Sequence, residues 1–598
     1  MTKTHTFHIP VMGIGYTIDT PLKVSHLGID SVISLVDDML LEKLRKMYSE
    51  KFEIPYKEIT EKFQDFRAKR ITSYLNLMND LADKKLNELK NSVSGVKDYF
   101  NMLPDSSTIK NEFKKLTAQH FNLDDLKSWI DTNITKGSID VNIMTKVDKD
   151  NYNKNKKLSI EFNDAHAALR GFAESNLTSS LILSAGMNPR LYAYLENFDD
   201  FYPNKNGEFK KKIVLKVSDY RSALIQGKFL AKKGIWVSEY RVESGLNCGG
   251  HAFATDGYLL GPILAEFRDN KDEIKQTVHE LFIKALKDKN RVVPQSPLDL
   301  KITAQGGVGT AEEHQFLLEY YNVDSVGWGS PFLLVPEATT VDNQTLKKLE
   351  NAKEKDLYLS DISPLGVPFN NLKGNTKDEE KFSYIAKNRP GSPCPKKYVA
   401  LNYEFDKKGL CTASRKYQYL KIKELEKQNL SELETKKKYN KIIEKSCVCV
   451  GLGTSALLNY HVETKKEGPG VSICPGPNMA YFSNQMSLKN ITDHIYGRAN
   501  MISRSDRPNL FIKELNIYID YLKKKFEESK DYMDVKQEKY LKKFSNNLKD
   551  GITYYQNVFN TVYNHFNEIK SSLVKELDKS KDKLNQITVE IEKAKWMV

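Results

Sequence analysis

The chain has 598 residues, of which 40% are hydrophobic and 28% are charged, and it contains six cysteines. This composition is typical of a globular protein and excludes a disordered, collagen-like or disulfide-stabilised chain. The 91 lysines and arginines exceed the 78 aspartates and glutamates, for a net charge of +13, but the lysines alternate with acidic residues along the chain. We therefore expect a solvated, lysine-rich surface that binds neither nucleic acid nor a membrane.

The N-terminal sequence MTKTHTFHIPVMGIG lacks the charged head and apolar core of a secretory signal. No run approaches the ~18 consecutive apolar residues that a transmembrane helix requires. We therefore expect a cytoplasmic protein in a reducing compartment. Length does not fix the number of domains, because ~150 residues per domain would give about four, whereas a single barrel with insertions can exceed ~400 residues.

Short runs rich in valine and isoleucine recur along the chain, with helical patterns between them, as in successive βα units of a parallel sheet. The eight runs are His8–Gly15, Asp30–Val36, Ile139–Lys146, Ser180–Ala185, Lys212–Ser218, Ile235–Val242, Leu300–Gln305 and Asp324–Gly329. Eight such units predict an α/β fold, the (β/α)8 or TIM barrel, over residues 1–36 and 137–345. The chemistry of this fold lies at the C-terminal ends of the strands.

Three regions do not fit the barrel pattern. Residues 37–136 predict a helical insertion, because Ile71, Leu75, Met78, Ala82, Leu86 and Leu89 recur every three or four positions. Residues 346–505 form a cysteine-containing extension that we expect to cover the barrel mouth. Residues 506–598 carry an apolar stripe from Leu515 to Leu577, including Val562 and Ile569, and the polar gap Ser529–Lys536 predicts a helical hairpin. We expect both helical additions to pack on the barrel, while an oligomer or partner contact stays open.

Two glycine-rich turns follow the last two predicted strands. The first reads Gly306-Gly307-Val308-Gly309-Thr310 and leads into a helix at Ala311, and the second reads Gly327-Trp328-Gly329-Ser330. Without a Cβ, glycine lets backbone N–H groups approach an anion, and a helix N-terminus adds a favourable dipole. Because a phosphate commonly binds after the last two strands of this barrel, the two turns predict a phosphate site.

A histidine follows the sixth predicted strand, in the sequence ESGLNCGGHAF from Glu243 to Phe253. His251 comes directly after Gly249 and Gly250, where a side chain can project into the barrel mouth. Imidazole is the side chain best suited to move a proton near neutral pH, so His251 is a candidate catalytic residue. The structural alternative is a histidine that only bonds a loop carbonyl.

Together, ESGLNCGGHAF, AQGGVGTAEEH and VGWGSPF resemble the flavin-dependent nitronate monooxygenase family, formerly called 2-nitropropane dioxygenases, and the related flavin-type enoyl-acyl carrier protein reductases. The segments Val141–Met144 and Ser363–Asn370 also resemble that family. The resemblance spans Ile9–Phe482 in scattered blocks and omits Asp37–Lys136 and the C-terminal helices. It implies an FMN-binding barrel, and it is less specific for the substrate.

The resemblance also implies roles for particular residues. Those implied to contact FMN are Met12, Gly13, Asn142, Lys216, Gly249, Gly250, Gly306, Gly307, Gly327, Trp328, Gly329 and Ser330. Among them, Asn142 would bond the isoalloxazine edge, and the last six would hold the phosphate. Lys216 is a weaker candidate, because a lysine late in a strand is more often solvated. His251 would act as base for a carbon acid or would orient its oxygens.

Five of the six cysteines follow the predicted barrel, at Cys394, Cys411, Cys447, Cys449 and Cys474. Their spacing matches neither a zinc site nor a ferredoxin sequence. We expect buried, reduced thiols and no metal, with a metal or iron–sulfur site as the alternative.

These features predict an FMN-dependent oxidoreductase, a flavoprotein acting as a monooxygenase that oxidises alkyl nitronates or a related carbon acid with O2. Reduction of an acyl thioester by an enoyl reductase, with NAD(P)H as hydride donor, is the enzymatic alternative. A third hypothesis is a non-catalytic scaffold whose added helices bind a partner.

Overall fold

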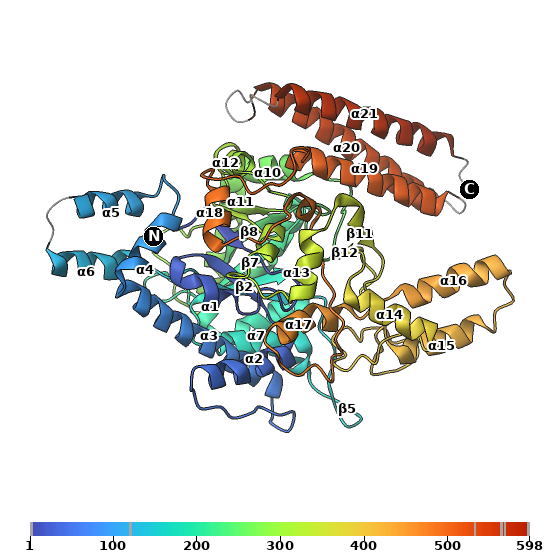
Figure 1. Ribbon diagram of the computed structural model, residues 1–598, viewed down its shortest axis with the longest axis horizontal. Coiled ribbons are helices and arrows are strands. Elements are labelled where there is room, and N and C mark those ends of the chain that lie inside the picture. The colour runs from blue at the N-terminus through green and yellow to red at the C-terminus, as the bar shows by residue number, and fades with distance from the viewer. Residues whose placement is uncertain (1–3, 119–121, 531–533, 562–565, 567–569, 595–598) are drawn as a thin grey trace.

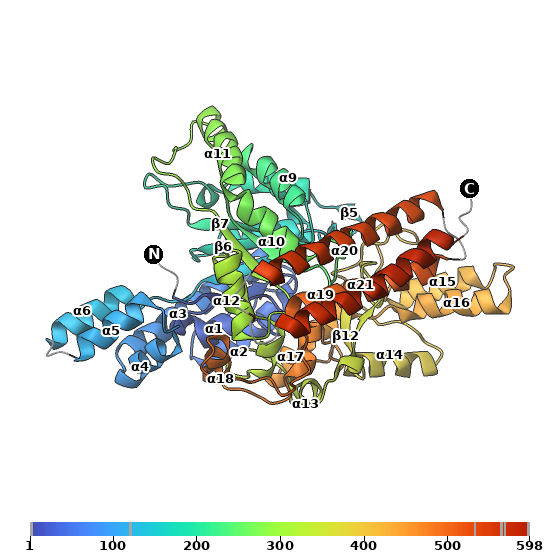
Figure 2. The same cartoon turned by 90° about the horizontal axis from the view of Figure 1, so that it is seen from above.

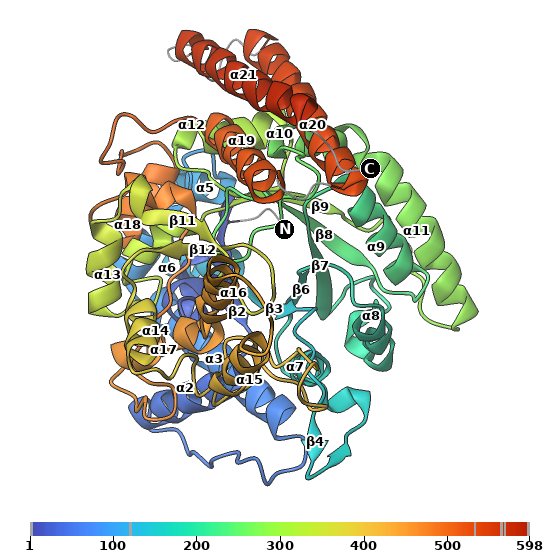
Figure 3. The ribbon, with the colours of Figure 1, turned by 90° about the vertical axis from the view of Figure 1, so that its right-hand side faces the viewer.

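The computed structural model describes residues 4–118, 122–530, 534–561, 566 and 570–594. Eight parallel strands close into a barrel in the order β1-β2-β3-β6-β7-β8-β9-β10, with β10 returning to β1 (Figure 3). They are β1 (Phe7–Ile9), β2 (Asp30–Ser34), β3 (Ile139–Met144), β6 (Ser179–Ser184), β7 (Lys211–Val217), β8 (Val237–Glu243), β9 (Lys301–Gln305) and β10 (Ser325–Gly327). The prediction of a (β/α)8 barrel is confirmed, and each predicted strand overlaps one of these.

Helices surround the barrel and build the additions (Figure 1). Those beside the strands are α1 (Thr20–Val24), α2 (Asp38–Lys51), α7 (Asp164–Ala173), α8 (Pro189–Tyr194), α9 (Tyr220–Ala231), α10 (Leu260–Asp269), α11 (Lys271–Asp288) and α12 (Ala311–Tyr320). Short 3₁₀ helices are η1 (Ser25–Leu27), η2 (Ile160–Phe162), η3 (Leu195–Asn197), η4 (Asp199–Phe201), η5 (Ser330–Leu334), η6 (Glu354–Asp356) and η7 (Pro477–Tyr481).

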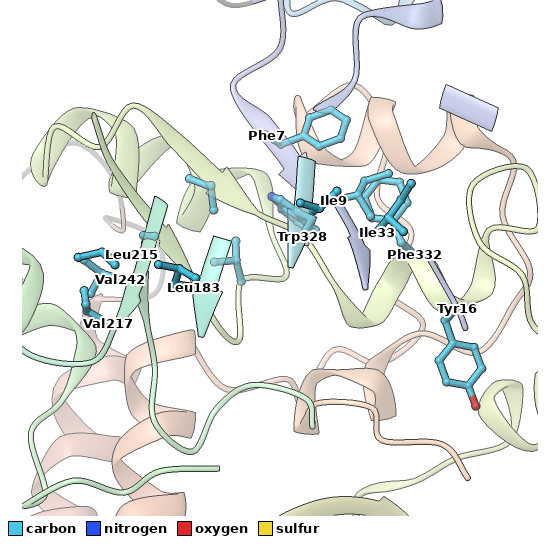
Figure 4. Close-up of a cluster of buried hydrophobic side chains, with 14 of the residues drawn as sticks. Phe7, Ile9, Tyr16, Ile33, Leu183, Leu215, Val217, Val242, Trp328 and Phe332 are labelled. Atoms are coloured by element: carbon cyan, nitrogen blue, oxygen red, sulfur yellow. The ribbon is translucent and has the colours of Figure 1, made fainter. Parts of the chain in front are cut away.

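Successive side chains of each barrel strand point alternately to the surrounding helices and to the barrel axis. Figure 4 shows outward side chains, among them Leu183, Leu215 and Val242, which are at most 1% exposed. Along the axis, Val32, Ile182 and Val214 form a small cluster of their own, with Val11 packed against it. The residue two positions beyond each of these three therefore also points inward, toward the C-terminal mouth.

The predicted insertion is helical. It contains α2, α3 (Phe66–Lys90), α4 (Val93–Met102), α5 (Thr108–Ala118) and α6 (Leu123–Asn133). The apolar stripe of α3 is buried against α7, where the Thr72 hydroxyl donates to the Gly171 carbonyl at 2.8 Å. A Cβ at Gly171 would lie 2.8 Å from the Ala68 carbonyl oxygen, so glycine is required for this close helix packing. The stripe therefore packs within the chain.

The extension contains β11 (Leu357–Ser360), β12 (Phe369–Leu372) and six helices. These are α13 (Asn343–Glu350), α14 (Thr376–Ala386), α15 (Arg415–Leu425), α16 (Glu432–Glu444), α17 (Val448–Asn459) and α18 (Leu488–Ile495). The strands β4 (Tyr152–Asn153) and β5 (Lys156–Lys157) form a small separate hairpin in the connection between β3 and α7, outside the extension. Glu432–Asn459 is long and apolar enough to cross a membrane by composition, contrary to the prediction, but 67% of its apolar window is buried inside the protein. Its apolar part is α17, which serves as a core helix.

The C-terminal addition is a set of three helices: the two predicted ones, which are divided at the polar gap Ser529–Lys536 as expected, and one further helix that follows them. They are α19 (Leu510–Ser529), α20 (Val535–Thr561) and α21 (Lys570–Lys593), which lie together over one side of the barrel (Figure 2). Apolar residues keep the same spacing in the sequence from α20 to α21, so the sequence pattern does not show that α20 and α21 are separate helices. Val562 and Ile569 of the predicted stripe lie outside the described residues.

The apolar faces of these C-terminal helices contact the barrel directly. The rings of Phe511 in α19 and Phe316 in α12 lie 5.9 Å apart. The Tyr555 hydroxyl in α20 accepts a hydrogen bond from the Gly261 N–H in α10 at 3.1 Å. The stripe thus covers α10 and α12, as the packing hypothesis requires.

Deleting Arg507–Val598 should therefore expose large apolar side chains of α10 and α12. We expect the truncated chain to aggregate, because contiguous apolar surface of this kind drives association. Light scattering of the truncated and full chains measures this. A truncated chain that stays monodisperse with an unchanged thermal midpoint would show that the covered face contributes nothing to stability.

Candidate functional site

A cavity opens at the C-terminal end of the barrel, and residues at or just beyond the ends of all eight strands line it. Inward side chains at or near the ends of six strands meet there, namely Ser34, Asn142, Met144, Ser184, Lys216, Glu243 and Gln305. The extension adds Ser363, Phe369, Leu452 and Cys474 to the wall. The extension therefore contributes one side of the barrel mouth.

The structure brings nearly all of the predicted site residues together. The following line the cavity: Met12, Gly13, Asn142, Lys216, Gly249, Gly250, His251, Gly306, Gly307, Gly327, Gly329 and Ser330. Trp328 does not line it. Its side chain is fully buried on the outside of the barrel, where the indole Nε1–H donates to His314 Nδ1 at 3.1 Å. Because Gly327 points inward, strand alternation turns Trp328 outward.

The first glycine turn is held by packing against the loop after β8. Gly306 and Gly307 have φ of +121° and +79°, and a Cβ at Gly307 would lie 2.0 Å from Asn247 Nδ2. Within the described chain, the backbone N–H groups of Gly307, Val308 and Gly329 donate to no protein acceptor. All three residues line the cavity, so these free donors make this part of it a candidate anion-binding end.

Helix α12 contributes less to this end than its sequence predicted. Glu313 in its first turn accepts the Gly309 N–H at 2.9 Å, and the Thr310 hydroxyl accepts the Glu313 N–H at 3.2 Å. Arg507 in turn pairs with Glu313 at 2.8 Å. The Glu313 carboxylate thus takes the Gly309 N–H and the Thr310 hydroxyl takes the Glu313 N–H, while Ala311 and Glu312 do not line the cavity. The glycine turns remain as the candidate anion-binding groups.

His251 lies at another part of the cavity wall and is held by the extension. Its Nε2 is 2.7 Å from Ser363 Oγ, and its ring meets the Phe369 ring edge-on at 4.9 Å. Backbone bonds from Ala252 N to Pro368 O and from Asn370 N to Gly250 O fix the same loop, each 2.9 Å long. Burial, together with the nearby charge of Lys216, lowers the pKa of His251 to about 4, so the imidazole is neutral at pH 7.

Lys216 is an inward residue and not a solvated strand end. Its Nζ lies 2.7 Å from Glu243 Oε2 on the next strand, and Gln305 Nε2 donates to Glu243 Oε1 at 2.6 Å. Burial alone would lower the pKa of Lys216, but the contact with Glu243 outweighs it and raises the pKa. Lys216 therefore carries a fixed positive charge beside His251.

Two buried amide oxygens in the cavity wall have no hydrogen-bond partner in the described structure. They are Gln305 Oε1 and Asn247 Oδ1. Since a buried polar atom without a partner is costly, these oxygens favour a ligand that offers hydroxyl or N–H donors.

A second cavity adjoins the first and shares Lys216, Glu243 and Phe253 with it. Its other wall includes Tyr521 of α19 and Tyr540 of α20. The Lys216–Glu243 pair thus separates two chambers, the second of which the C-terminal helices complete.

All six cysteines are free and buried. The thiols of Cys394, Cys411, Cys447 and Cys449 lie near one another, and burial beside the other thiols raises the pKa of Cys394 and of Cys449. Among the described residues, no group of three or more His, Cys, Asp or Glu side chains is arranged to hold a metal ion. The extension thus gathers four thiols that lie far apart in sequence.

Sequence reasoning assigned no role to Ser363, Glu243, Gln305 or Arg507. Glu243 and Gln305 could have been found, because each is the last inward position of its strand. Ser363 begins the segment that supported the family resemblance, yet nothing in that segment pairs it with His251. No sequence signal identifies Arg507.

No family model matches this chain, and no curated protein matches it. Solved structures similar to it include FabK from Thermotoga maritima, at 12% identity over 83% of this chain and 92% of that one, with a TM-score of 0.35. The enoyl reductase domain of MlnA from Bacillus amyloliquefaciens is similar at 13% identity over 63% and 86%, with a TM-score of 0.32. Nitroalkane oxidase from Streptomyces ansochromogenes is similar at 9% identity over 82% and 94%, with a TM-score of 0.35. Because the sequence identities and TM-scores are this low, these structures do not identify the activity of this chain. That activity has to be argued from the chain's own residues.

Replacing Gly307 by valine should disturb the anion-binding end. The added Cβ would displace Asn247, and a branched residue at φ +79° carries backbone strain of about 1–3 kcal/mol. We expect FMN affinity, measured by fluorescence titration, to fall at least tenfold. Gly374→Val is the matched control, because Gly374 has φ +70° and only Lys348 Nζ near its Cβ, at 3.9 Å. Equal affinities in the two folded variants would rule out the Gly307 turn as the phosphate site.

Proposed function

We propose that this protein is an FMN-dependent oxidoreductase that oxidises alkyl nitronates or a related carbon acid, with O2 as acceptor. The observation that carries the proposal is a single cavity with unpaired backbone donors from two glycine turns and a neutral histidine in its wall. An anionic cofactor and a proton acceptor could therefore share one enclosed space.

The residues present fit FMN. The N–H groups of Gly307, Val308 and Gly329 and the Ser330 hydroxyl would hold its phosphate, although the Ser330 oxygen already accepts the Gly476 N–H at 2.8 Å. The unpartnered oxygens of Gln305 and Asn247 would accept from its ribityl hydroxyls. Asn142 and the backbone at Met12 and Gly13 would lie beside its ring.

When bound, FMN would supply the electron transfer, which no side chain here can provide. His251 accepts a proton because it is neutral at pH 7, and its contact with Ser363 fixes the ring. With the proton on Nε2 directed at Ser363, the lone pair on Nδ1 is available to the substrate. The cation of Lys216 stabilises the carbanion or nitronate that forms, since opposite charge favours the ionised form.

The low pKa of His251 makes it a weak base, so a substrate that is already ionised is favoured over one that must be deprotonated. For this reason we propose nitronates, and not neutral nitroalkanes, as the preferred substrates.

A second candidate function is reduction of an enoyl thioester with NAD(P)H as hydride donor. The second cavity favours it, because this cavity meets the first at Lys216 and Glu243 and offers room for an extended acyl chain. Anaerobic addition of NAD(P)H separates the two activities. Bleaching of the flavin bands favours the reductase, and unchanged bands favour the nitronate enzyme.

The visible spectrum of the purified protein tests the cofactor first. Bands near ~370 and ~450 nm are expected for bound oxidised flavin, whose redox chemistry belongs to the cofactor. A colourless protein that takes up no added FMN would instead support the non-catalytic scaffold.

His251→Ala should slow turnover of a neutral nitroalkane by about 10²–10⁴-fold, because that substrate still needs a base. The pre-ionised nitronate should lose less than about tenfold, and FMN should stay bound because other residues hold it. Steady-state kinetics with both substrate forms measure this, with His461→Ala on the surface as control. Equal losses on both forms would exclude His251 as the base.

A further inference from the structure

The start of the C-terminal addition, Arg507–Glu514, reaches the loops after β8 and β9 at three points. Arg507 Nη2 donates to the Gly307 carbonyl at 2.9 Å. Asn247 Nδ2 donates to the Leu510 carbonyl at 3.3 Å. The Ser244 hydroxyl donates to the Glu514 carboxylate. A segment that the family resemblance omits therefore touches both loops that line the anion-binding end.

Arg507 determines how the glycine turn is oriented. In a trans peptide the C=O and the following N–H point in opposite directions, so holding the Gly307 carbonyl toward Arg507 turns the Val308 N–H away from it. Arg507 Nε also donates to Asn478 Oδ1 at 2.8 Å, and Asn478 Nδ2 donates to the Val308 carbonyl at 2.7 Å. Two consecutive carbonyls of the turn are thus fixed from outside the barrel.

Glu514 holds the loop after β8. Its side chain is fully buried and accepts from the Ser244 hydroxyl, from Leu260 N at 2.9 Å and from the Tyr555 hydroxyl at 3.4 Å. Ser244 Oγ in turn accepts the Asn247 N–H at 3.1 Å. A chain of hydrogen bonds therefore runs from α19 to Asn247, the residue that packs against Gly307.

This carboxylate has no cation beside it among the described residues, and burial raises its pKa to about 7. The titratable groups that face it are Tyr518, Tyr555 and Cys248, and burial raises the pKa of each well above its usual value, so they stay neutral between pH 6 and 8. An unpaired buried carboxylate is costly, and an apolar residue would serve helix packing better. Glu514 therefore serves to hold its three hydrogen-bond donors, Ser244, Leu260 and Tyr555, in place.

We infer that the segment Arg507–Glu514 holds the loops of the phosphate site in place, and that Arg507 and Glu514 are positioning residues which make FMN binding and docking of the C-terminal helices depend on each other. This inference rests on the proposed FMN function. Coupling of this kind is reciprocal, so either event strengthens the other.

The test is Glu514→Gln, with Glu528→Gln on the exposed side of the same helix as control. The glutamine amide adds a donor to a site with three donors, which resembles the protonated carboxyl. At pH 8 we expect the Glu514→Gln variant to bind FMN at least fivefold more weakly than the wild type, and this ratio should shrink toward one as the pH falls to 6. Titration of the FMN phosphate near pH ~6 affects both proteins equally and cancels in the ratio.

Hydrogen exchange of the ligand-free proteins supplies a readout that needs no FMN. Amides of residues 244–249 and 306–309 should exchange faster in Glu514→Gln than in the control, and FMN should slow exchange over residues 507–529 of the wild type. A pH-independent ratio near one, with unchanged exchange in these loops, would overturn the inference. A wild-type protein that binds no FMN would overturn the proposed function, while the ligand-free comparison would still decide whether Glu514 positions the loops. If Glu514→Gln does not fold, Arg507→Lys replaces it at pH 8, because lysine keeps the charge near Glu313 but cannot make four hydrogen bonds. We expect weaker FMN binding and faster exchange of residues 306–309 in that variant, and wild-type values for both would overturn the inference.

Discussion

The two-residue alternation of the barrel strands is the constraint on which the candidate site depends. It sends Leu183, Leu215 and Val242 outward to the helices and leaves the alternate positions to the axis. At the C-terminal end most of those inward positions are polar or charged, among them Asn142, Lys216, Glu243 and Gln305, with Met144 as an apolar exception. One geometric rule thus separates an apolar outer shell from a polar mouth, and it places a lysine and a glutamate from neighbouring strands 2.7 Å apart.

The same rule shows what could be predicted from sequence. The eight strands were identifiable because each is a short β-branched run, and the glycine turns and His251 follow directly at strand ends. The resemblance assigned the whole motif Gly327–Ser330 to the cofactor site, and for Trp328 this is wrong. The strand alternation that puts Gly327 inside the barrel requires the Trp328 side chain to lie outside it. Applying that alternation to β8 and β9 would also have identified Glu243 and Gln305 as cavity residues.

Contacts between distant segments could not be predicted in this way. Ser363 lies 112 residues from His251, and Arg507 lies 194 residues from Glu313. Neither contact leaves a local pattern, because a serine or an arginine in a loop is compatible with many environments. The boundary between α20 and α21 was missed for a related reason, since apolar spacing reports which face is buried but not where one helix stops.

The additions to the barrel do more than cover it. The extension supplies Ser363 and Phe369 to His251, and the C-terminal segment supplies Arg507 and Glu514 to the loops after β8 and β9. The Arg507–Glu313 pair is almost fully buried, with side chains 6% and 2% exposed, and removing one partner of such a pair costs about 3–5 kcal/mol because the other charge stays buried. Since Arg507 also fixes the Gly307 carbonyl, any change that frees the C-terminal helices also frees the turn that presents the Val308 N–H. The stability of the additions and the geometry of the anion-binding end are therefore set by the same few hydrogen bonds.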